Sequence, residues 1–211
     1  MQLKTFCVNP LGENTYLLWD EATREALVVD VGMQSEAEMS RFANFLDQRN
    51  LRLTMALQTH LHFDHIFGLP FLHRQYHLTP FSHQADVQLY RQMPAWAAEC
   101  GLSMTGELPE LTQFVKHGDV LSWAGTEIHV IHTPGHTPGG VCYYVPVAKL
   151  VFTGDTLFAG CVGRADLPGG DYEQELLSVR NLLQALPDET QVLPGHGPSS
   201  TIADEKQNPY L

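Results

Sequence analysis

The sequence predicts an α/β fold in which two β-sheets are covered by helices and form one layered αβ/βα body. In each half of the 211-residue chain, short β-rich runs are followed by an amphipathic helix. The β-rich runs are bounded by Gly or Pro, which mark the turns. The composition, with 44% hydrophobic and 17% charged residues, is typical of a globular protein. We therefore expect a single domain over residues 1–211.

The first third of the chain is expected to form three strands and one helix. The β-rich runs are Leu3–Val8, Thr15–Trp19 and Ala26–Val29. A helix follows over Ser35–Arg49, because Ser35 matches an N-cap and Glu38 occupies the capping-box position. Its apolar residues recur on one face, at Met39, Phe42 and Leu46.

The middle of the chain is expected to be mostly helical. Leu53–Leu57 has the pattern of a buried strand, and a helix is predicted over Ile66–Tyr76. A second helix is predicted over Gln84–Cys100, where Pro94 is expected to kink or divide it. Gly101–Glu110 is predicted to be a loop.

The last part of the chain returns to strands and contains one further helical pattern. The predicted strands are Phe114–Lys116, Glu127–His132, Val141–Val145, Leu150–Thr153 and Gln191–Leu193. A helix is predicted over Tyr172–Leu186, with Asp171 as N-cap and Gln174 at the capping-box position. Its apolar stripe is expected to contain Tyr172, Leu176, Val179 and Leu183.

Charge and hydropathy exclude two classes of partner. Acidic residues outnumber Lys and Arg by 24 to 12, and the basic residues never form a run, whereas nucleic-acid binding needs clustered cations. No apolar run approaches the roughly 18 residues of a membrane span, so we expect no membrane association. The N-terminus lacks the pattern of a secretory signal, so we expect a cytoplasmic protein.

Cysteine and histidine usage favours histidine as the metal-binding residue type. The cysteines show no C-x-x-C spacing and are expected to be free, buried thiols: Cys7, Cys100, Cys142 and Cys161. Histidine is abundant, at 11 residues in a chain with few basic residues. Imidazole is the commonest protein ligand for metal ions, so the histidine positions are informative.

One histidine cluster follows the strand predicted at Leu53–Leu57. It has the form H-x-H-x-D-H and consists of His60, His62, Asp64 and His65. In an extended chain, side chains two residues apart point to the same side, so His60 and His62 can reach one metal ion, which leaves Asp64 and His65 for a second. A shuffled chain of this composition matches the pattern with a probability on the order of one in a thousand. The alternative, exposed loop histidines, has roughly one chance in ten.

Three further polar residues follow predicted strands. His136 lies in TPGHTPGG, Asp155 in GDTLF and His196 in PGHG. In layered α/β folds, functional residues gather in the loops at strand ends. Each residue has an ordinary explanation by itself, as a turn cap or an exposed side chain, but together with the H-x-H-x-D-H cluster they indicate a metal site.

These four motifs resemble the metallo-β-lactamase superfamily, and within it the glyoxalase II (hydroxyacylglutathione hydrolase) type. The similarity covers the chain from about Tyr16 to its end. It implies a four-layer αβ/βα sandwich with the metal site at one edge. It also implies two divalent metal ions, zinc being expected first and iron or manganese being the alternatives.

The resemblance also implies which residues bind these ions. One ion would be held by His60, His62 and His136. The other would be held by Asp64, His65 and His196. Asp155 would bridge both ions, and Asp64 is also the expected catalytic residue.

The reaction implied by the resemblance is hydrolysis of a small-molecule thioester by metal-bound hydroxide. Full-length glyoxalase II enzymes are similar to this chain plus a C-terminal extension that contacts glutathione, and we expect this extension to be absent because the chain ends soon after His196. Arg164 is the expected contact for a substrate carboxylate. Asp166 stands near the place of an aromatic contact in these enzymes, so we expect glutathione to be held loosely.

Two other functions are compatible with these motifs. A persulfide dioxygenase-like oxidoreductase would use a single iron held by His60, His136 and Asp155. A catalytically inactive binding module is disfavoured because the ligand set is complete. β-Lactamases and flavodiiron proteins are also disfavoured, since the β-lactamase cysteine ligand is absent and flavodiiron proteins carry Glu at the position of His62. The oligomeric state cannot be predicted from these features.

Overall fold

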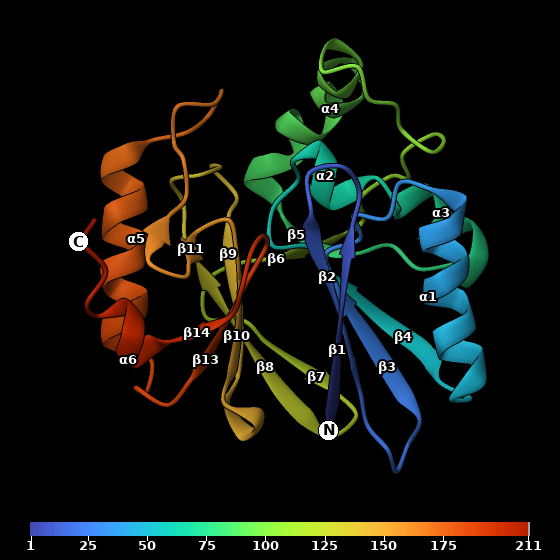
Figure 1. Cartoon of the computed structure of the whole chain (residues 1–211), viewed down its shortest axis with the longest axis horizontal. Coiled ribbons are helices and arrows are strands. Elements are labelled where there is room, and N and C mark those ends of the chain that lie inside the picture. The colour runs from blue at the N-terminus through green and yellow to red at the C-terminus, as the bar shows by residue number, and fades with distance from the viewer. Residues whose placement is uncertain (211) are drawn as a thin grey trace. The chain divides into compact units, whose positions relative to one another are not determined.

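The computed structural model of the protein describes residues 1–210, which form two compact units. Unit 1 contains Met1–Ser82 and Val87–Phe114, and unit 2 contains His83–Asp86 and the described chain from Val115 onward. Each unit has a six-stranded sheet and its own helices (Figure 1). The α/β class predicted from the sequence is therefore confirmed, whereas the single domain stays a prediction.

Unit 1 is built on a mixed sheet. In spatial order its strands are β1 (Gln2–Val8), β2 (Glu13–Trp19), β3 (Glu25–Val29), β4 (Arg52–Leu57), β5 (Phe81–His83) and β6 (Gln113–Val115). β1, β2 and β3 are antiparallel, whereas β3, β4 and β5 run parallel. The carboxyl ends of β3 and β4 therefore lie side by side, and the residues that follow both strands meet at one edge of the sheet.

Four helices belong to unit 1: α1 (Glu36–Gln48), α2 (Phe63–Ile66), α3 (Leu69–Tyr76) and α4 (Val87–Glu99). α1 begins as predicted, because Ser35 and Glu38 form a complete capping box. The predicted apolar face of α1 is buried, and the Phe42 ring packs edge-on against Phe6 of β1 at 5.5 Å. Capping and burial together fix α1 against the sheet.

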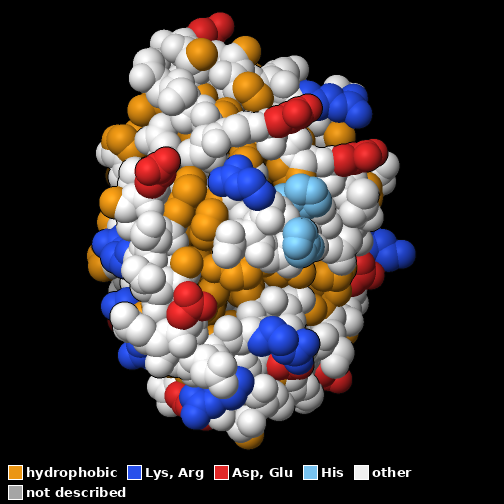
Figure 2. Space-filling model, turned by 90° about the vertical axis from the view of Figure 1, so that its right-hand side faces the viewer, with side chains coloured by type: hydrophobic (Ala, Val, Ile, Leu, Met, Phe, Trp, Pro, Cys, Tyr) orange, Lys and Arg blue, Asp and Glu red, His pale blue; other side chains and the backbone are white. Residues whose placement is uncertain are grey.

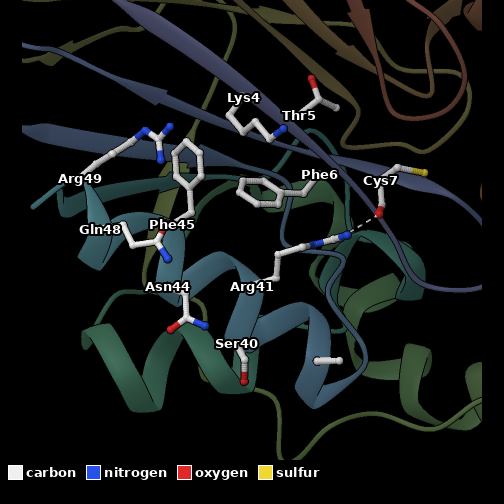
Figure 3. A pocket seen from close by; sticks show the side chains of 11 residues that line it. Lys4, Thr5, Phe6, Cys7, Ser40, Arg41, Asn44, Phe45, Gln48 and Arg49 are labelled. Atoms are coloured by element: carbon white, nitrogen blue, oxygen red, sulfur yellow. Dashed lines mark hydrogen bonds between the residues drawn. The ribbon is translucent and has the colours of Figure 1, made fainter.

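A groove of about 700 Å³ lies between β1 and α1 (Figure 3). Arg49 stacks on the Phe45 ring with 3.9 Å between Cζ and the ring centroid. Arg41 lies over Phe6 and donates a hydrogen bond to the Cys7 carbonyl. These contacts place cations on the aromatic rings at the margin of the core, where the charged ends stay in water.

The predicted helix over Ile66–Tyr76 is wrong as a single element, because it is broken at Gly68 into α2 and α3. The Gly68 N–H donates to the Val31 carbonyl at 2.7 Å, and a Cβ at this position would lie 2.9 Å from the Val31 side chain. Pro70 lies in the first turn of α3, where its missing N–H is tolerated. The helix is therefore interrupted where Gly68 packs closely against the chain that follows β3.

The helix predicted over Gln84–Cys100 is shorter at its start. Phe81–His83 forms β5 and Gln84–Asp86 a 3₁₀ turn, so α4 begins at Val87. Pro94 does not divide α4, which continues to Glu99. The loop predicted over Gly101–Glu110 is confirmed.

Unit 2 is built on a second mixed sheet. In spatial order its strands are β14 (Ser200–Thr201), β13 (Gln191–Pro194), β10 (Leu150–Gly154), β9 (Val141–Val145), β8 (Thr126–His132) and β7 (Val120–Trp123). β10 and β13 are parallel, and the other pairs are antiparallel. Smaller elements are β11 (Leu157–Phe158), β12 (Cys161–Val162), η2 (Pro146–Ala148) and α6 (Ile202–Glu205). The predicted strands are confirmed, whereas β7 and these short elements were not predicted.

The helix α5 (Tyr172–Ala185) covers the second sheet and begins at the predicted N-cap, Asp171. Its buried face differs from the predicted stripe, because Tyr172 is 53% exposed and Glu175 is fully buried. The Glu175 carboxylate accepts a hydrogen bond from the backbone of His136, which explains why a charged residue lies on this face. The helix thus supports the TPGHTPGG loop.

All four cysteines are free, as predicted, but the predicted burial is wrong for three of them. Cys142 of β9 is buried in the core cluster of unit 2, whereas Cys7, Cys100 and Cys161 are exposed. These three lie at the margins of elements, where the chain turns back to the surface.

The described surface carries both signs of charge. On the face drawn in Figure 2, acidic and basic side chains are interspersed with apolar ones and do not form a stripe of one sign. Among residues 1–210, no helix has the length and apolarity needed to cross a membrane.

Candidate metal centre

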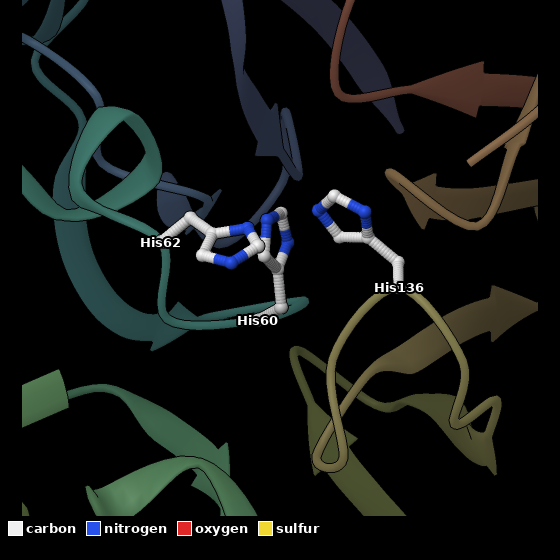
Figure 4. Close-up of side chains that lie close together, drawn as sticks. All are labelled: His60, His62 and His136. Atoms are coloured by element: carbon white, nitrogen blue, oxygen red, sulfur yellow. The ribbon is translucent and has the colours of Figure 1, made fainter. Parts of the chain in front are cut away.

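The H-x-H-x-D-H cluster lies in unit 1, with His60 and His62 in the turn after β4 and Asp64 and His65 in α2. The rings of His60 and His62 project from the same loop, with centroids 4.9 Å apart (Figure 4). The His65 ring lies 4.0 Å from the His60 ring, and His65 Nε2 is 3.8 Å from Asp64 Oδ2. All four side chains are buried or nearly so. The sequence motif therefore forms one compact group of imidazoles and a carboxylate.

The carboxylate of Asp30, directly after β3, orients this group. Its Oδ2 accepts a hydrogen bond from His65 Nδ1 at 3.0 Å and from the Thr59 hydroxyl at 2.8 Å. Its Oδ1 accepts from the Thr59 backbone N–H at 2.8 Å. Because β3 and β4 are parallel neighbours, Asp30 reaches the loop that follows β4.

These contacts fix the tautomers of two histidines. The Thr59 hydroxyl donates to Asp30, so its oxygen accepts from His60 Nδ1 at 3.1 Å. The Nδ1 atoms of His60 and His65 therefore carry the protons, and their lone pairs lie on Nε2. A neutral imidazole whose other nitrogen donates to a carboxylate or hydroxyl is the usual form of a metal ligand.

A second buried carboxylate lies behind His65. Glu13 of β2 accepts from the Thr15 hydroxyl, and its Oε1 is 4.0 Å from His65 Nδ1. Burial raises the pKa of Glu13 well above its usual range, and the neighbouring His65 opposes this rise. The ligand atoms of Glu13, Asp30 and His65 lie within 4.8 Å of one another. Since His65 Nδ1 already donates to Asp30, we interpret these carboxylates as supports of the histidine.

Gly32 is required by the close packing around Glu13. A Cβ at this position would lie 2.1 Å from Glu13 Oε2 and 2.4 Å from the Asp64 carbonyl oxygen. Asn9 ties the same segments together, because its side-chain amide donates to the carbonyls of Gly32 and Asp64. The start of α2, which carries Asp64, is thus fixed by the turn after β1 and by the chain after β3.

His136 lies in unit 2, at the tip of the loop after β8 (Figure 4). Its backbone N–H donates to Glu175 at 2.7 Å, and its Nδ1 donates to the Arg164 carbonyl at 2.7 Å. A carbonyl only accepts, so the Nδ1 of His136 carries the proton and its lone pair lies on Nε2. His136 thus has the same tautomer as His60 and His65.

The TPGHTPGG loop is held by two buried carboxylates. Asp86 accepts from the Thr137 hydroxyl at 2.9 Å and from the Gly139 N–H at 2.6 Å. Glu175 holds the other side of the loop, and burial raises its pKa to about 8. Gly135 has φ = 150°, and a Cβ there would lie 2.3 Å from the Glu175 backbone. The glycines therefore allow the loop to contact both carboxylates.

Asp155 and His196 follow the parallel strands β10 and β13 of the same unit. Asp155 Oδ2 lies 3.5 Å from His136 Nε2 and 3.7 Å from His196 Nε2. The chain at this edge is tied by the Gly195 N–H, which donates to the Gly154 carbonyl at 2.7 Å. The three predicted residues of unit 2 therefore direct their ligand atoms to one place, with Asp155 in the middle.

Arg164, the predicted substrate contact, is exposed and already paired. Its guanidinium makes a bidentate ion pair with Asp166, at 2.7 and 2.8 Å. Arg164 contacts the site through its backbone carbonyl, which accepts a hydrogen bond from His136 and so orients this side chain. A carboxylate of the substrate would have to compete with Asp166 for this guanidinium.

The donor sets in both units fit divalent metal ions. Imidazole Nε2 atoms and carboxylate oxygens are the ligands that zinc, iron and manganese share. In each unit the ligand atoms converge, and three imidazoles are turned by hydrogen bonds at Nδ1 so that Nε2 is the available donor.

The supporting residues were not predicted from the sequence. Asp30 had a detectable signal, because an acidic residue directly after a buried strand lies at the edge where sites form. Glu13, Glu175 and Asp86 had no such signal, because they are distant in sequence from the histidines they support.

Comparison with known proteins assigns this arrangement to a family. A family model described as the metallo-beta-lactamase superfamily matches residues 8–196. The hydroxyacylglutathione hydrolase GloC of Haemophilus influenzae is 33% identical, over 100% of this chain and 98% of its own length.

Two solved structures are similar over nearly their whole length. The BLEG-1 B3 metallo-beta-lactamase has a TM-score of 0.89 and 31% identity, and the alignment covers 100% of this chain and 99% of that one. TTHA1623, solved in a di-iron-bound form, has a TM-score of 0.87 and 34% identity, with 99% and 100% covered. The predicted fold is thereby confirmed.

Proposed function

Because the chain belongs to the metallo-beta-lactamase superfamily and is a metal-dependent hydrolase of this fold, we propose that it hydrolyses small-molecule thioesters of the hydroxyacylglutathione kind. The name of the 33% identical GloC supports this substrate class. The observation that carries the proposal is the common tautomer of His60, His65 and His136, each held at Nδ1 so that Nε2 can bind metal.

We further propose that seven residues bind two divalent ions. His60, His62 and His136 would hold one ion, and Asp64, His65 and His196 the other. Asp155 would bridge them, which is consistent with the position of its Oδ2 near the Nε2 atoms of His136 and His196. The di-iron form of TTHA1623 supports a dinuclear site, and zinc, iron and manganese are all compatible with these ligands.

When bound, the two ions would supply a hydroxide near neutral pH and polarise the carbonyl of the thioester. The protein residues then have mainly geometric roles. Asp30 and Thr59 hold His60 and His65 in the ligand tautomer, and Glu175 fixes the backbone of His136. We propose Asp64 as the catalytic carboxylate, which accepts a hydrogen bond from the attacking water and so orients it.

The direct test is hydrolysis of lactoyl and acetyl thioesters by protein loaded with zinc, iron or manganese, with thiol release measured by a colorimetric reagent. Elemental analysis of the same samples gives the number of ions per chain. Thioester cleavage that is lost with a chelator and restored by metal supports the proposal. A protein that binds one iron, consumes oxygen with a persulfide and releases no thiol from thioesters contradicts it.

β-Lactam hydrolysis is a second candidate, favoured by one specific observation. The BLEG-1 B3 metallo-beta-lactamase is 31% identical over the whole chain. Ions held by the proposed ligands would supply the same hydroxide for hydrolysis of a strained amide as for hydrolysis of a thioester. Nitrocefin hydrolysis measured beside thioester hydrolysis decides which compound has the higher kcat/KM.

A further inference from the structure

Two aromatic side chains of unit 1 lie beside His62. The Trp96 ring of α4 meets the His62 ring edge-on, with centroids 5.6 Å apart and an interplanar angle of 90°. The Phe63 ring of α2 lies 5.9 Å from Trp96. The cluster of polar ligand residues therefore has an apolar wall on the side of α4.

Trp96 differs from the other tryptophans of the chain in its exposure. Trp19 and Trp123 are 7% and 3% exposed, whereas Trp96 is only partly buried. Its neighbours Ala95 and Ala98 are small and exposed, so the helix itself does not cover the indole. An indole with a solvent-accessible surface beside a proposed metal ligand is available for contact with a bound molecule.

The wall is held on a rigid element. Met93 and Ala97, which flank Trp96 on α4, are completely buried. The Tyr90 hydroxyl donates to the Pro109 carbonyl at 2.8 Å and ties α4 to the following loop. A binding surface on a packed helix keeps its geometry better than one on a free loop.

We propose that Trp96 and Phe63 form a subsite for an apolar, ring-bearing acyl group of the substrate. This inference rests on the proposed thioester hydrolysis. The acyl substituent and the thiol sulfur are both bonded to the reacting carbonyl, so a short acyl group stays within reach of the proposed metal ligands, which include His62, whereas the rest of the thiol carrier extends away from them. A phenyl group would contact the two rings, whereas the methyl group of a lactoyl ester would leave most of their surface in water.

Trp96 has an alternative role, the positioning of His62 through the edge contact. The two roles differ in how they depend on the acyl group. Loss of positioning would slow all substrates by the same factor, whereas loss of a subsite would affect a phenyl-bearing acyl group more than a methyl-bearing one.

The kinetic test compares mandeloyl and lactoyl esters of the same thiol, which differ only by phenyl in place of methyl. We expect Trp96→Ala to lower the ratio of their kcat/KM values by about tenfold relative to the zinc-loaded wild type. Trp96→Phe should keep most of the preference. Phe45→Ala is the matched control, because Phe45 is a partly buried ring packed on the same core cluster, where it lies against Trp19. An unchanged ratio in Trp96→Ala overturns the proposal.

A second measurement does not require thioester hydrolysis. Mandelate added to the zinc-loaded wild type should change the tryptophan emission, lactate should change it much less, and Trp96→Phe should abolish the response. Equal responses to both acids, or a response that persists in Trp96→Phe, overturn the subsite. If thioesters are not cleaved but mandelate still gives a specific response, the proposed reaction is refuted and the subsite is supported.

Discussion

His65 Nδ1 lies 3.0 Å from Asp30 Oδ2, in a region where both residues are fully buried. The same oxygen accepts the hydroxyl of Thr59, whose oxygen in turn contacts His60 Nδ1. The carboxylate that directly follows β3 thus sets the orientation of two imidazoles, one in the turn after β4 and one in α2. Asp30 itself has φ = 55°, a left-handed conformation that Asp tolerates better than most residues.

Asp30→Asn should weaken metal binding without removing a proposed ligand. The amide cannot accept all three of the hydrogen bonds that the carboxylate accepts, so His60 and His65 lose orientation, and the metal affinity should fall by about 10- to 100-fold. Competition with a fluorescent chelator measures the affinity. Asp47→Asn, an exposed change on α1, is the control and should have the wild-type affinity. Equal affinities of both variants would contradict the role of Asp30.

Gly135→Ala should destabilise the protein more than the same change at another glycine with positive φ. A Cβ at Gly135 would lie 2.3 Å from the Glu175 backbone. A Cβ at Gly118, which has φ = 84°, would have no non-neighbouring heavy atom within 4 Å. Gly118→Ala is expected to cost about 1–2 kcal/mol from backbone strain alone. Gly135→Ala adds a clash that displaces α5, so we expect at least about 3 kcal/mol.

Urea unfolding of the metal-depleted variants measures these two costs. The metal affinity gives an independent check, because displacement of Glu175 also loosens the backbone of His136. Gly135→Ala should therefore bind metal more weakly, and Gly118→Ala should not. Equal losses of stability in the two variants would mean that the loop yields to the extra methyl group.

The elements that the sequence predicts correctly are those determined by local signals. α1 begins at Ser35 because the capping box needs only two residues three positions apart. The break at Gly68 was missed because its cause, the Val31 carbonyl, lies far away in the sequence. Tyr172 was predicted on the apolar face of α5 but is exposed, whereas Glu175 is buried and accepts a hydrogen bond from the distant His136 backbone.

In the candidate site, too, local features could be predicted from the sequence and long-range contacts could not. The candidate ligand residues are recognisable from the motif because they lie at neighbouring positions of the chain, and the structure keeps the four residues of H-x-H-x-D-H together. The carboxylates that orient them come from other strands and helices. Register and packing determine which acidic residue reaches which imidazole, and neither is encoded in a short motif.

Asp155→Ala should remove more metal than the loss of a peripheral ligand. Its Oδ2 lies near the Nε2 atoms of both His136 and His196, as expected for a bridging carboxylate. The wild type should approach about two ions per chain, whereas His196→Ala should keep about one and Asp155→Ala less than one. Elemental analysis after gel filtration measures these ratios. Full occupancy of Asp155→Ala would show that the residue does not bridge.

Asp166→Asn should improve the use of substrates that carry a carboxylate. The hydrogen bonds and charge of Arg164 lower the pKa of Asp166 to about 2, so the ion pair is intact at neutral pH and occupies the guanidinium. Since the pair is exposed, its release should lower KM by only about two- to fivefold, with kcat unchanged. The variant Arg164→Gln should raise KM for the same substrate. Both variants should treat a methyl-ester analogue as the wild type does.

The same ion pair leads us to expect a high KM for lactoylglutathione in the wild type. Asp166 competes with the substrate for Arg164, so little binding energy is available for the glutathione carboxylates. Replacing glutathione by a smaller thiol should therefore change kcat/KM only modestly. Steady-state kinetics with the two thioesters test this expectation. Saturation by lactoylglutathione at low micromolar concentration, together with inactivity on smaller thioesters, would show that another surface of the protein binds glutathione and that Arg164 is not the limiting contact.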